Sequence, residues 1–133
     1  MRMMTSLILG LSIAAGAASA KPHLRDVKAI DDNMLAVAIA MEIDEKCSTI
    51  RTRKGKGLSF LWSLKRKANG LGYSDDEINA YRKSDKEKAR IRARGEAYVK
   101  SKGLNPKVAS DLCKLGNAEI AQKSTIGSLL KAK

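Results

Sequence analysis

The chain has 133 residues and carries 26 lysines and arginines against 14 acidic residues, so its formal net charge is +12 at neutral pH. This length corresponds to one domain. With one histidine and two cysteines, the chain lacks the ligands of a Cys/His zinc site, a C-x-x-C redox pair and a haem-attachment motif. We therefore expect no metal and no cofactor.

Residues 1–20 have the pattern of a secretory signal peptide. Arg2 supplies a positive charge, residues 7–18 form an uncharged apolar run, and residues 18–20 read A-S-A, an A-x-A cleavage site. A membrane anchor is the alternative, but it needs about 20 apolar residues. We expect cleavage after Ala20 and export of residues 21–133, a single helical domain, to an oxidising compartment such as the periplasm.

The first expected helix covers residues 34–47. Three polar residues at 31–33 offer N-cap chemistry. Residues 34–41 are apolar nearly all round, which predicts a central, buried helix with Cys47 on its core side. The basic, glycine-containing segment 52–57 predicts a loop, because it does not match the phosphate-binding pattern G-x-x-x-x-G-K-[ST].

A second helix is expected from about Leu58 to Asn69, with Leu61, Leu64 and Ala68 on its inner face. Trp62 lies near the edge of that face. Either it packs partly buried, or it sits at a docking surface or membrane interface. The other aromatic residues at core spacing are interpreted as packing residues: Phe60, Tyr81 and Tyr98.

Two capping boxes predict the next two helix starts, one at Ser74 with Glu77 and one at Ser84 with Glu87. The second of these helices is expected to run over residues 85–102.

The last helices are expected after Asn105-Pro106, which supply an N-cap and an N1 proline, and after Ser124. Gly116 inside the first of them costs helix propensity, which predicts close packing against a neighbour. With no sustained strand-like alternation, the sequence predicts an all-α, single-domain bundle of five or six helices.

The two cysteines, Cys47 and Cys113, are expected to pair. In an oxidising compartment two cysteines usually form a disulfide, and this one closes a loop that spans 66 residues of sequence. Two free thiols are the alternative. The pair would tie the first helix to one near the C-terminus.

The positive charge predicts an anionic target. Export argues against nucleic acid, which leaves an acidic envelope protein, an anionic lipid surface or an acidic cell-wall polymer. A merely solvated surface is the alternative. The candidate basic docking surface consists of Arg51, Arg53, Lys54, Lys56, Lys65, Arg66, Lys67 and Trp62.

A hydrolase is the alternative function. Acid–base hydrolysis needs two carboxylates that face one cleft, and the candidates are Glu42, Asp44, Asp75, Asp76, Glu77 and Glu119. A Ser–His–Asp triad is not expected, because the only histidine, His23, lies next to the expected cleavage site. The main hypothesis is a non-enzymatic accessory protein.

Both cysteines and the closing pattern "LGxxEIxxxSxIGxLL", here Leu115 to Leu130, resemble a small family of exported alphaproteobacterial proteins of unknown function. This resemblance covers nearly the whole chain after residue 20. It implies an exported helical domain with a disulfide and no catalytic residues. It also implies a periplasmic accessory role on the respiratory NADH:quinone oxidoreductase. Lys123 stands where this family often has glycine.

Overall fold

The computed structural model describes residues 20–133, so the expected signal peptide, apart from Ala20, lies outside the described part. Six α-helices, one 3-10 helix and one two-stranded sheet make up this part, which confirms the predicted fold class. In chain order the elements are η1 (Leu24–Asp26), α1 (Lys28–Lys46), β1 (Ile50–Thr52), α2 (Lys54–Gly70), α3 (Asp75–Lys83), α4 (Asp85–Ser101), α5 (Ala109–Gln122), α6 (Thr125–Ser128) and β2 (Leu130–Ala132).

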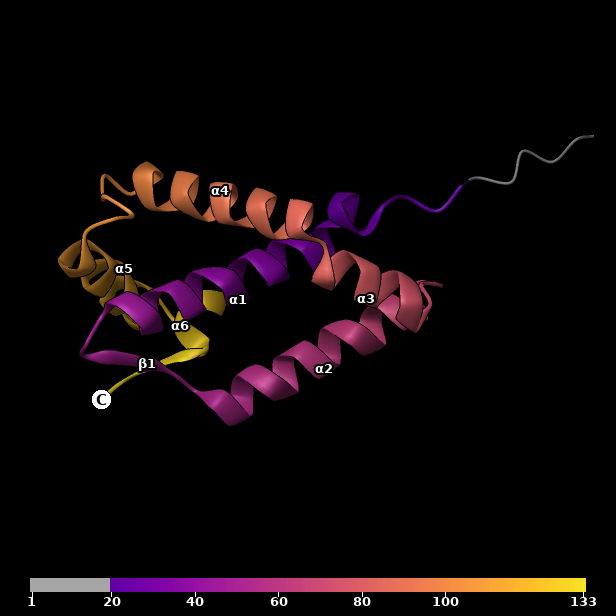
Figure 1. The fold of residues 1–133 in the computed structure, drawn as a ribbon. Coiled ribbons are helices and arrows are strands. Elements are labelled where there is room, and N and C mark those ends of the chain that lie inside the picture. Colours follow the sequence, from indigo (N-terminus) through magenta and orange to yellow (C-terminus); the bar gives the residue numbers. More distant parts are fainter. Residues whose placement is uncertain (1–19) are drawn as a thin grey trace, which may run out of the picture.

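Helix α1 is the centre of the molecule (Figure 1). Helix α4 packs along one side of it and α2 along the other, while α5 and α6 cover its C-terminal half. Helix α3 connects the far end of α2 to α4. The C-terminus returns to β1, so the two ends of the described chain lie at opposite ends of the molecule.

The disulfide joins Cys47, which ends α1, to Cys113 in α5, with their Cα atoms 5.2 Å apart. The predicted pairing is therefore confirmed, and the alternative of two free thiols is wrong. The bond fastens the C-terminal end of α1 to α5, at a point where Cys47 is buried.

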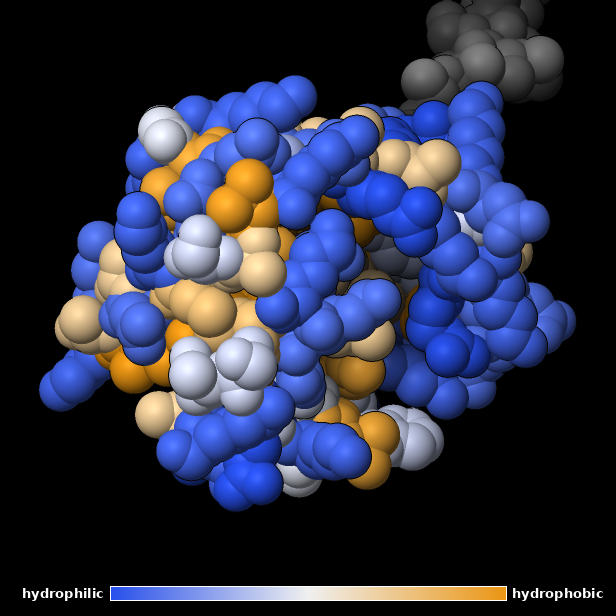
Figure 2. Space-filling view, turned by 60° about the vertical axis from the view of Figure 1, so that its left-hand side comes forward, coloured by the Kyte–Doolittle hydropathy of each residue, from blue (hydrophilic) through white to orange (hydrophobic). Residues whose placement is uncertain are grey.

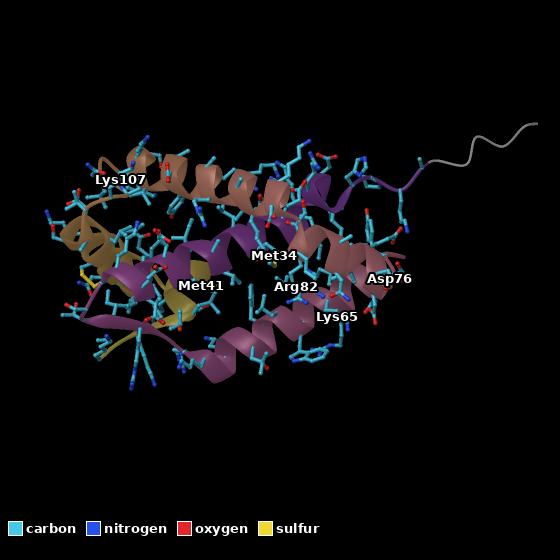
Figure 3. All side chains as sticks on the ribbon, in the orientation of Figure 1. Met34, Met41, Lys65, Asp76, Arg82 and Lys107 are labelled. Atoms are coloured by element: carbon cyan, nitrogen blue, oxygen red, sulfur yellow. A yellow bond between two sulfur atoms is a disulfide. The ribbon has the colours of Figure 1, made fainter. Side chains whose placement is uncertain are left out.

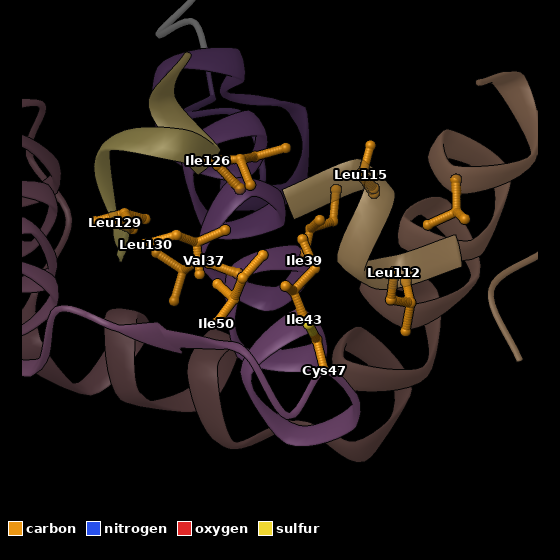
Figure 4. Packing of buried hydrophobic residues seen from close by; sticks show 13 residues of the cluster. Val37, Ile39, Ile43, Cys47, Ile50, Leu112, Leu115, Ile126, Leu129 and Leu130 are labelled. Carbon is orange, nitrogen blue, oxygen red and sulfur yellow. The ribbon is translucent and has the colours of Figure 1, made fainter. Parts of the chain in front are cut away.

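The main hydrophobic core lies where α1, α5, α6 and the sheet meet (Figure 4). Ile43 and Leu112 have no exposed surface at its centre. The predicted close packing of Gly116 is confirmed, because a Cβ at this residue would lie 2.6 Å from the Ile50 side chain and 2.9 Å from that of Ile43. A smaller cluster of Leu24, Ile30, Ala68 and Tyr73 joins η1, α1 and α2.

The predicted start of the first helix is wrong. Helix α1 begins at Lys28, with Val27 as an N-cap that makes no side-chain hydrogen bond. Asp31 is buried inside the first turns instead of capping them. Leu24 and Ile30 pack together in the smaller cluster, and this tertiary contact extends the helix past its best local capping residues.

The predicted loop at residues 52–57 is also wrong. Residues 50–52 form β1, which pairs antiparallel with β2, and α2 already begins at Lys54. The burial of one side chain from each strand favours the sheet over a loop: Ile50 is 1% exposed and Leu130 is 3% exposed. Three-residue strands have no alternation that a sequence pattern detects.

Several helix starts were predicted correctly from the local capping residues alone. The capping box of Ser74 and Glu77 is complete, and Ser124 caps α6 as predicted. Ser84 also caps its helix, but the Glu87 side chain forms ion pairs rather than the return bond of a capping box. Helix α5 starts three residues later than expected. The Asn105 side chain accepts a hydrogen bond from the Lys107 amide, as an N-cap would, but residues 105–108 form a turn and the helix begins only at Ala109.

Candidate functional site

The predicted basic residues fall into two groups near the two ends of α2. Arg51 lies in β1, and Arg53, Lys54 and Lys56 lie at the N-terminus of α2. Lys65, Arg66 and Lys67 lie near its C-terminus. At 1.5 Å of rise per residue, the two groups are about 18 Å apart along the helix.

The C-terminal strand adds two lysines to the first group. In the antiparallel register Arg51 lies directly opposite Lys131, and Lys133 donates its backbone N–H to the Thr49 carbonyl. Like charges directly opposite each other destabilise a sheet. We call the resulting set the cationic end: Arg51, Arg53, Lys54, Lys56, Lys131 and Lys133. None of these six side chains forms an ion pair with another described residue.

The start of α2 increases the positive potential at this end. Its first turn contains no acid, and its N-cap, Arg53, makes no side-chain hydrogen bond. The N-terminus of a helix carries partial positive charge, so lysines there are unfavourable for the helix. Asp44 lies close by, but its carboxylate accepts hydrogen bonds from the Thr52 hydroxyl and amide. These bonds, assisted by Lys133 and Lys54, hold the pKa of Asp44 below its ordinary value.

The second group surrounds Trp62, which is 53% exposed. The Lys65 ammonium lies 5.2 Å from the centroid of the Trp62 ring and 3.5 Å from an Asp75 oxygen. Arg66 and Lys67 have no acidic partner among residues 20–133. Figure 2 shows one face of the molecule, on which most side chains are hydrophilic and apolar residues are visible between them.

Most carboxylates proposed for hydrolysis have structural partners. Glu42 pairs with Lys46 at 2.5 Å, and Asp44 is bound to β1. Asp75 accepts from the Asn69 side chain, and Glu77 completes the cap of α3. Asp76 lies beside them in the first turn, where acids favour the helix.

Glu119 is the remaining candidate. It is 2% exposed and lines a pocket of about 240 Å³ that also includes Asp32. The hydroxyls of Tyr98 and Ser124 donate to its two oxygens. Burial and the bond to Glu119 raise the pKa of Tyr98 to about 12, so this phenol stays protonated as a donor. Both carboxylate oxygens of Glu119 therefore have donors, which explains how this side chain can be buried. The same bonds link α5 to α4 and to the cap of α6.

A buried charge network at the start of α1 escaped the sequence analysis. Asp31 accepts hydrogen bonds from Tyr81, Arg90 and Arg94. Burial by itself raises the pKa of Asp31, but the hydrogen bonds from Arg90 and Tyr81 outweigh it, so the pKa lies below its ordinary value. Because these partners belong to α3 and α4, the network fixes the end of α1 against both helices.

Within residues 20–133, no group of three His, Cys, Asp or Glu side chains is arranged to hold a metal ion. None of the helices in this part combines the length and apolar character that a membrane span requires.

A family model described as a family of unknown function, DUF5333, matches residues 22–131. The match covers almost all of the described chain, including both cysteines and the cationic end up to Lys131. No similar protein was found among curated proteins or solved structures.

Proposed function

We propose that this chain, which belongs to the family of unknown function DUF5333, works as a non-enzymatic accessory protein that binds an acidic partner through its basic surface. The observation that carries the proposal is the cationic end. None of its six positive side chains forms an ion pair within residues 20–133. Asp44, the carboxylate that Lys54 and Lys133 influence, is hydrogen-bonded to Thr52. Arg51 faces Lys131 directly across the sheet.

This arrangement has a stability cost. Cross-strand like charges and lysines at a helix N-terminus are each unfavourable, by about 0.2–1 kcal/mol. A surface with no function would not need both at one end of the molecule. An acidic partner relieves both costs when it binds, and a positive field speeds its encounter.

We place this function in the cell envelope. The signal-like residues 1–20 and the disulfide favour an oxidising compartment. The partner we propose is an acidic surface of an envelope protein, and the resemblance names the respiratory NADH:quinone oxidoreductase as the first complex to test.

Charge reversal tests the proposal. In pull-downs from envelope extracts of the source organism, wild-type protein should retain partners at low salt and lose them as ionic strength rises. The double variant Arg51→Glu with Lys56→Glu should lose them at every salt concentration. Lys86→Glu with Lys88→Glu is the matched control, because both lysines are exposed at the start of α4 and the change in net charge is the same.

Retention by the Arg51/Lys56 variant equal to that of the control would contradict the proposal, as would capture that does not depend on salt. Crosslinking in cells, followed by mass spectrometry, identifies the partner without assuming its class.

Peripheral binding to anionic lipid is a second candidate, favoured by the exposure of Trp62 next to Lys65. Tryptophan and lysine together suit a membrane interface. Flotation with vesicles that contain anionic lipid, compared with vesicles of neutral lipid only, tests it: specific flotation with anionic vesicles supports lipid binding, and its absence excludes it.

A further inference from the structure

Residues 34–41 of helix α1 are apolar nearly all round, but one side of this segment is not covered. A helix with this pattern is normally buried completely. Met34 and Ala38 are only half-buried, and Met41 is 62% exposed. Since Met34 lines a groove shared with α2, and residues seven apart lie on nearly the same face of a helix, Met41 continues this uncovered side.

Helix α2 presents a second apolar face to the same groove. Leu64 and Ala68 are its buried residues. These two residues line the groove together with Leu58, Leu61 and Trp62, the last two at spacings of three and four residues from Leu58. Leu58 and Trp62 are 60% and 53% exposed.

The groove has a volume of about 280 Å³ and lies between η1, α1, α2 and α3. Its apolar lining includes Leu24, Ile30, Met34, Leu61, Leu64 and Ile78. The charged residues of its lining are Lys65 and Arg82, and no carboxylate is among them. Figure 3 shows Lys65 and Arg82 on the α2 and α3 side of the groove, with Met34 across from them on α1.

We propose that this groove binds an amphipathic helix of the acidic partner, whose apolar face enters the groove and whose acidic residues pair with Lys65 and Arg82. The proposal rests on the proposed function and names the form of its partner. Along α2 the lining extends from Leu58 to Ala68, about 15 Å of helix. A ligand helix of about three turns spans this length with anchors at i, i+3 or i+4, and i+7.

The two positive side chains of the lining, Lys65 and Arg82, favour an acidic helix as the ligand of the groove. Asp75 pairs with Lys65 at 3.5 Å, but both side chains are exposed, and exposed pairs of this kind hold a side chain weakly. Within residues 20–133 the Arg82 guanidinium forms no ion pair, and its one side-chain hydrogen bond is donated to the Asn79 carbonyl oxygen at 3.4 Å. Both cations are therefore free to turn to a ligand carboxylate. A second copy of this chain does not fit, because a strongly basic protein would bring like charges together at the groove.

Trp62 is the only tryptophan of the chain and lies in the groove wall, so its fluorescence reports occupancy directly. The probe is a helical peptide of about four turns, with leucines at i, i+3 and i+7 and glutamates on both flanks. Its controls are a scrambled peptide of the same composition and a peptide with lysine in place of each glutamate. The full mature protein should show a saturable blue shift with the first peptide and none with either control.

Two variants locate the peptide. Leu58→Asp introduces a charge into the groove. It should weaken binding about tenfold or more, because it removes an apolar contact that the bound peptide would cover. Leu71→Asp is its matched control, since Leu71 is 51% exposed just after the same helix but does not line the groove. It should bind like the wild type.

Each other outcome overturns the inference. Equal binding of the scrambled peptide, or no binding of any peptide, rejects the groove as a helix site. A blue shift with anionic vesicles but with no peptide assigns the groove to lipid, and a stable dimer that covers Trp62 assigns it to a second copy. Failure here leaves the proposed function standing if envelope capture still disappears in the Arg51/Lys56 variant, whose residues lie outside the groove.

Discussion

The region around α5 and α6 and the region around α2 differ in how completely they bury their apolar residues. In the first, thirteen buried residues form one continuous cluster, and the disulfide closes it. In the second, α2 buries only Leu64 and Ala68, while Leu58, Trp62 and the following Leu71 are exposed. Stability is therefore concentrated in one region. These exposed apolar residues lie in the other, and the cationic end lies where the two meet, on the sheet and at the start of α2.

We expect the largest effect on stability from removing the disulfide between Cys47 and Cys113. Replacing both Cys47 and Cys113 by alanine opens a loop with a sequence separation of 66 residues. Chain-entropy arithmetic gives a loss of about 4 kcal/mol in the free energy of unfolding. Urea denaturation of the two proteins measures it. A loss below about 1 kcal/mol would show that packing alone holds the stapled region together.

A pair of leucine substitutions compares the two regions directly. Leu112 has no exposed surface, so Leu112→Ala should cost about 3 kcal/mol in the free energy of unfolding. Leu58 is 60% exposed, so Leu58→Ala should cost less than about 0.5 kcal/mol. The same denaturation experiment measures both. Similar costs at the two positions would mean that α2 is packed as tightly as α5.

A smaller effect is expected at the charge network that holds α1 against α3 and α4. Asp31→Asn removes a buried charge that accepts from Arg90, Arg94 and Tyr81, at a cost of about 2 kcal/mol at neutral pH. Because folding lowers the pKa of Asp31, its contribution is complete above the ordinary carboxyl pKa and is lost as the pH falls below about 4.

Thermal melts between neutral pH and about pH 2 test this sign. At neutral pH the Asp31→Asn variant should have a lower melting temperature than the wild type. On acidification its melting temperature should fall by less than that of the wild type does. Asp76→Asn, at an exposed carboxylate in the first turn of α3, should change the curve much less, because it removes only a small favourable interaction with the helix dipole. A wild-type curve that gains stability on acidification would contradict the assignment.

The fold was predictable where local chemistry and periodicity agree. Ser74, Ser124 and the apolar stripe through Cys47 predicted helices correctly, and the number and placement of the cysteines predicted the correct disulfide. The start of α1 and the two strands were not predictable, because contacts distant in sequence decide them. Leu24 and Ile30, at the start of α1, pack with Ala68 and Tyr73, and the strand that holds Ile50 pairs with the C-terminal strand.

The site was predictable only in part. The sequence identified the basic residues and their two groups along the chain, but the placement of these groups near the two ends of one helix depends on where α2 begins. The register of Arg51 with Lys131 and the buried partners of Asp31 and Glu119 require the tertiary structure. The groove has a sequence signal in retrospect: residues 34–41 are apolar on nearly every side, yet Met41 among them is 62% exposed.

The central claim is that the cationic end is kept for binding at the expense of stability. The stability of the double variant Arg51→Glu with Lys56→Glu, measured together with envelope capture, tests it most directly. The carboxylate introduced at position 51 would face Lys131, and the one at position 56 would lie in the first turn of α2. We therefore expect a gain of about 0.5 kcal/mol per substitution in the free energy of unfolding, together with loss of the partner. Lower stability with capture intact would contradict the account.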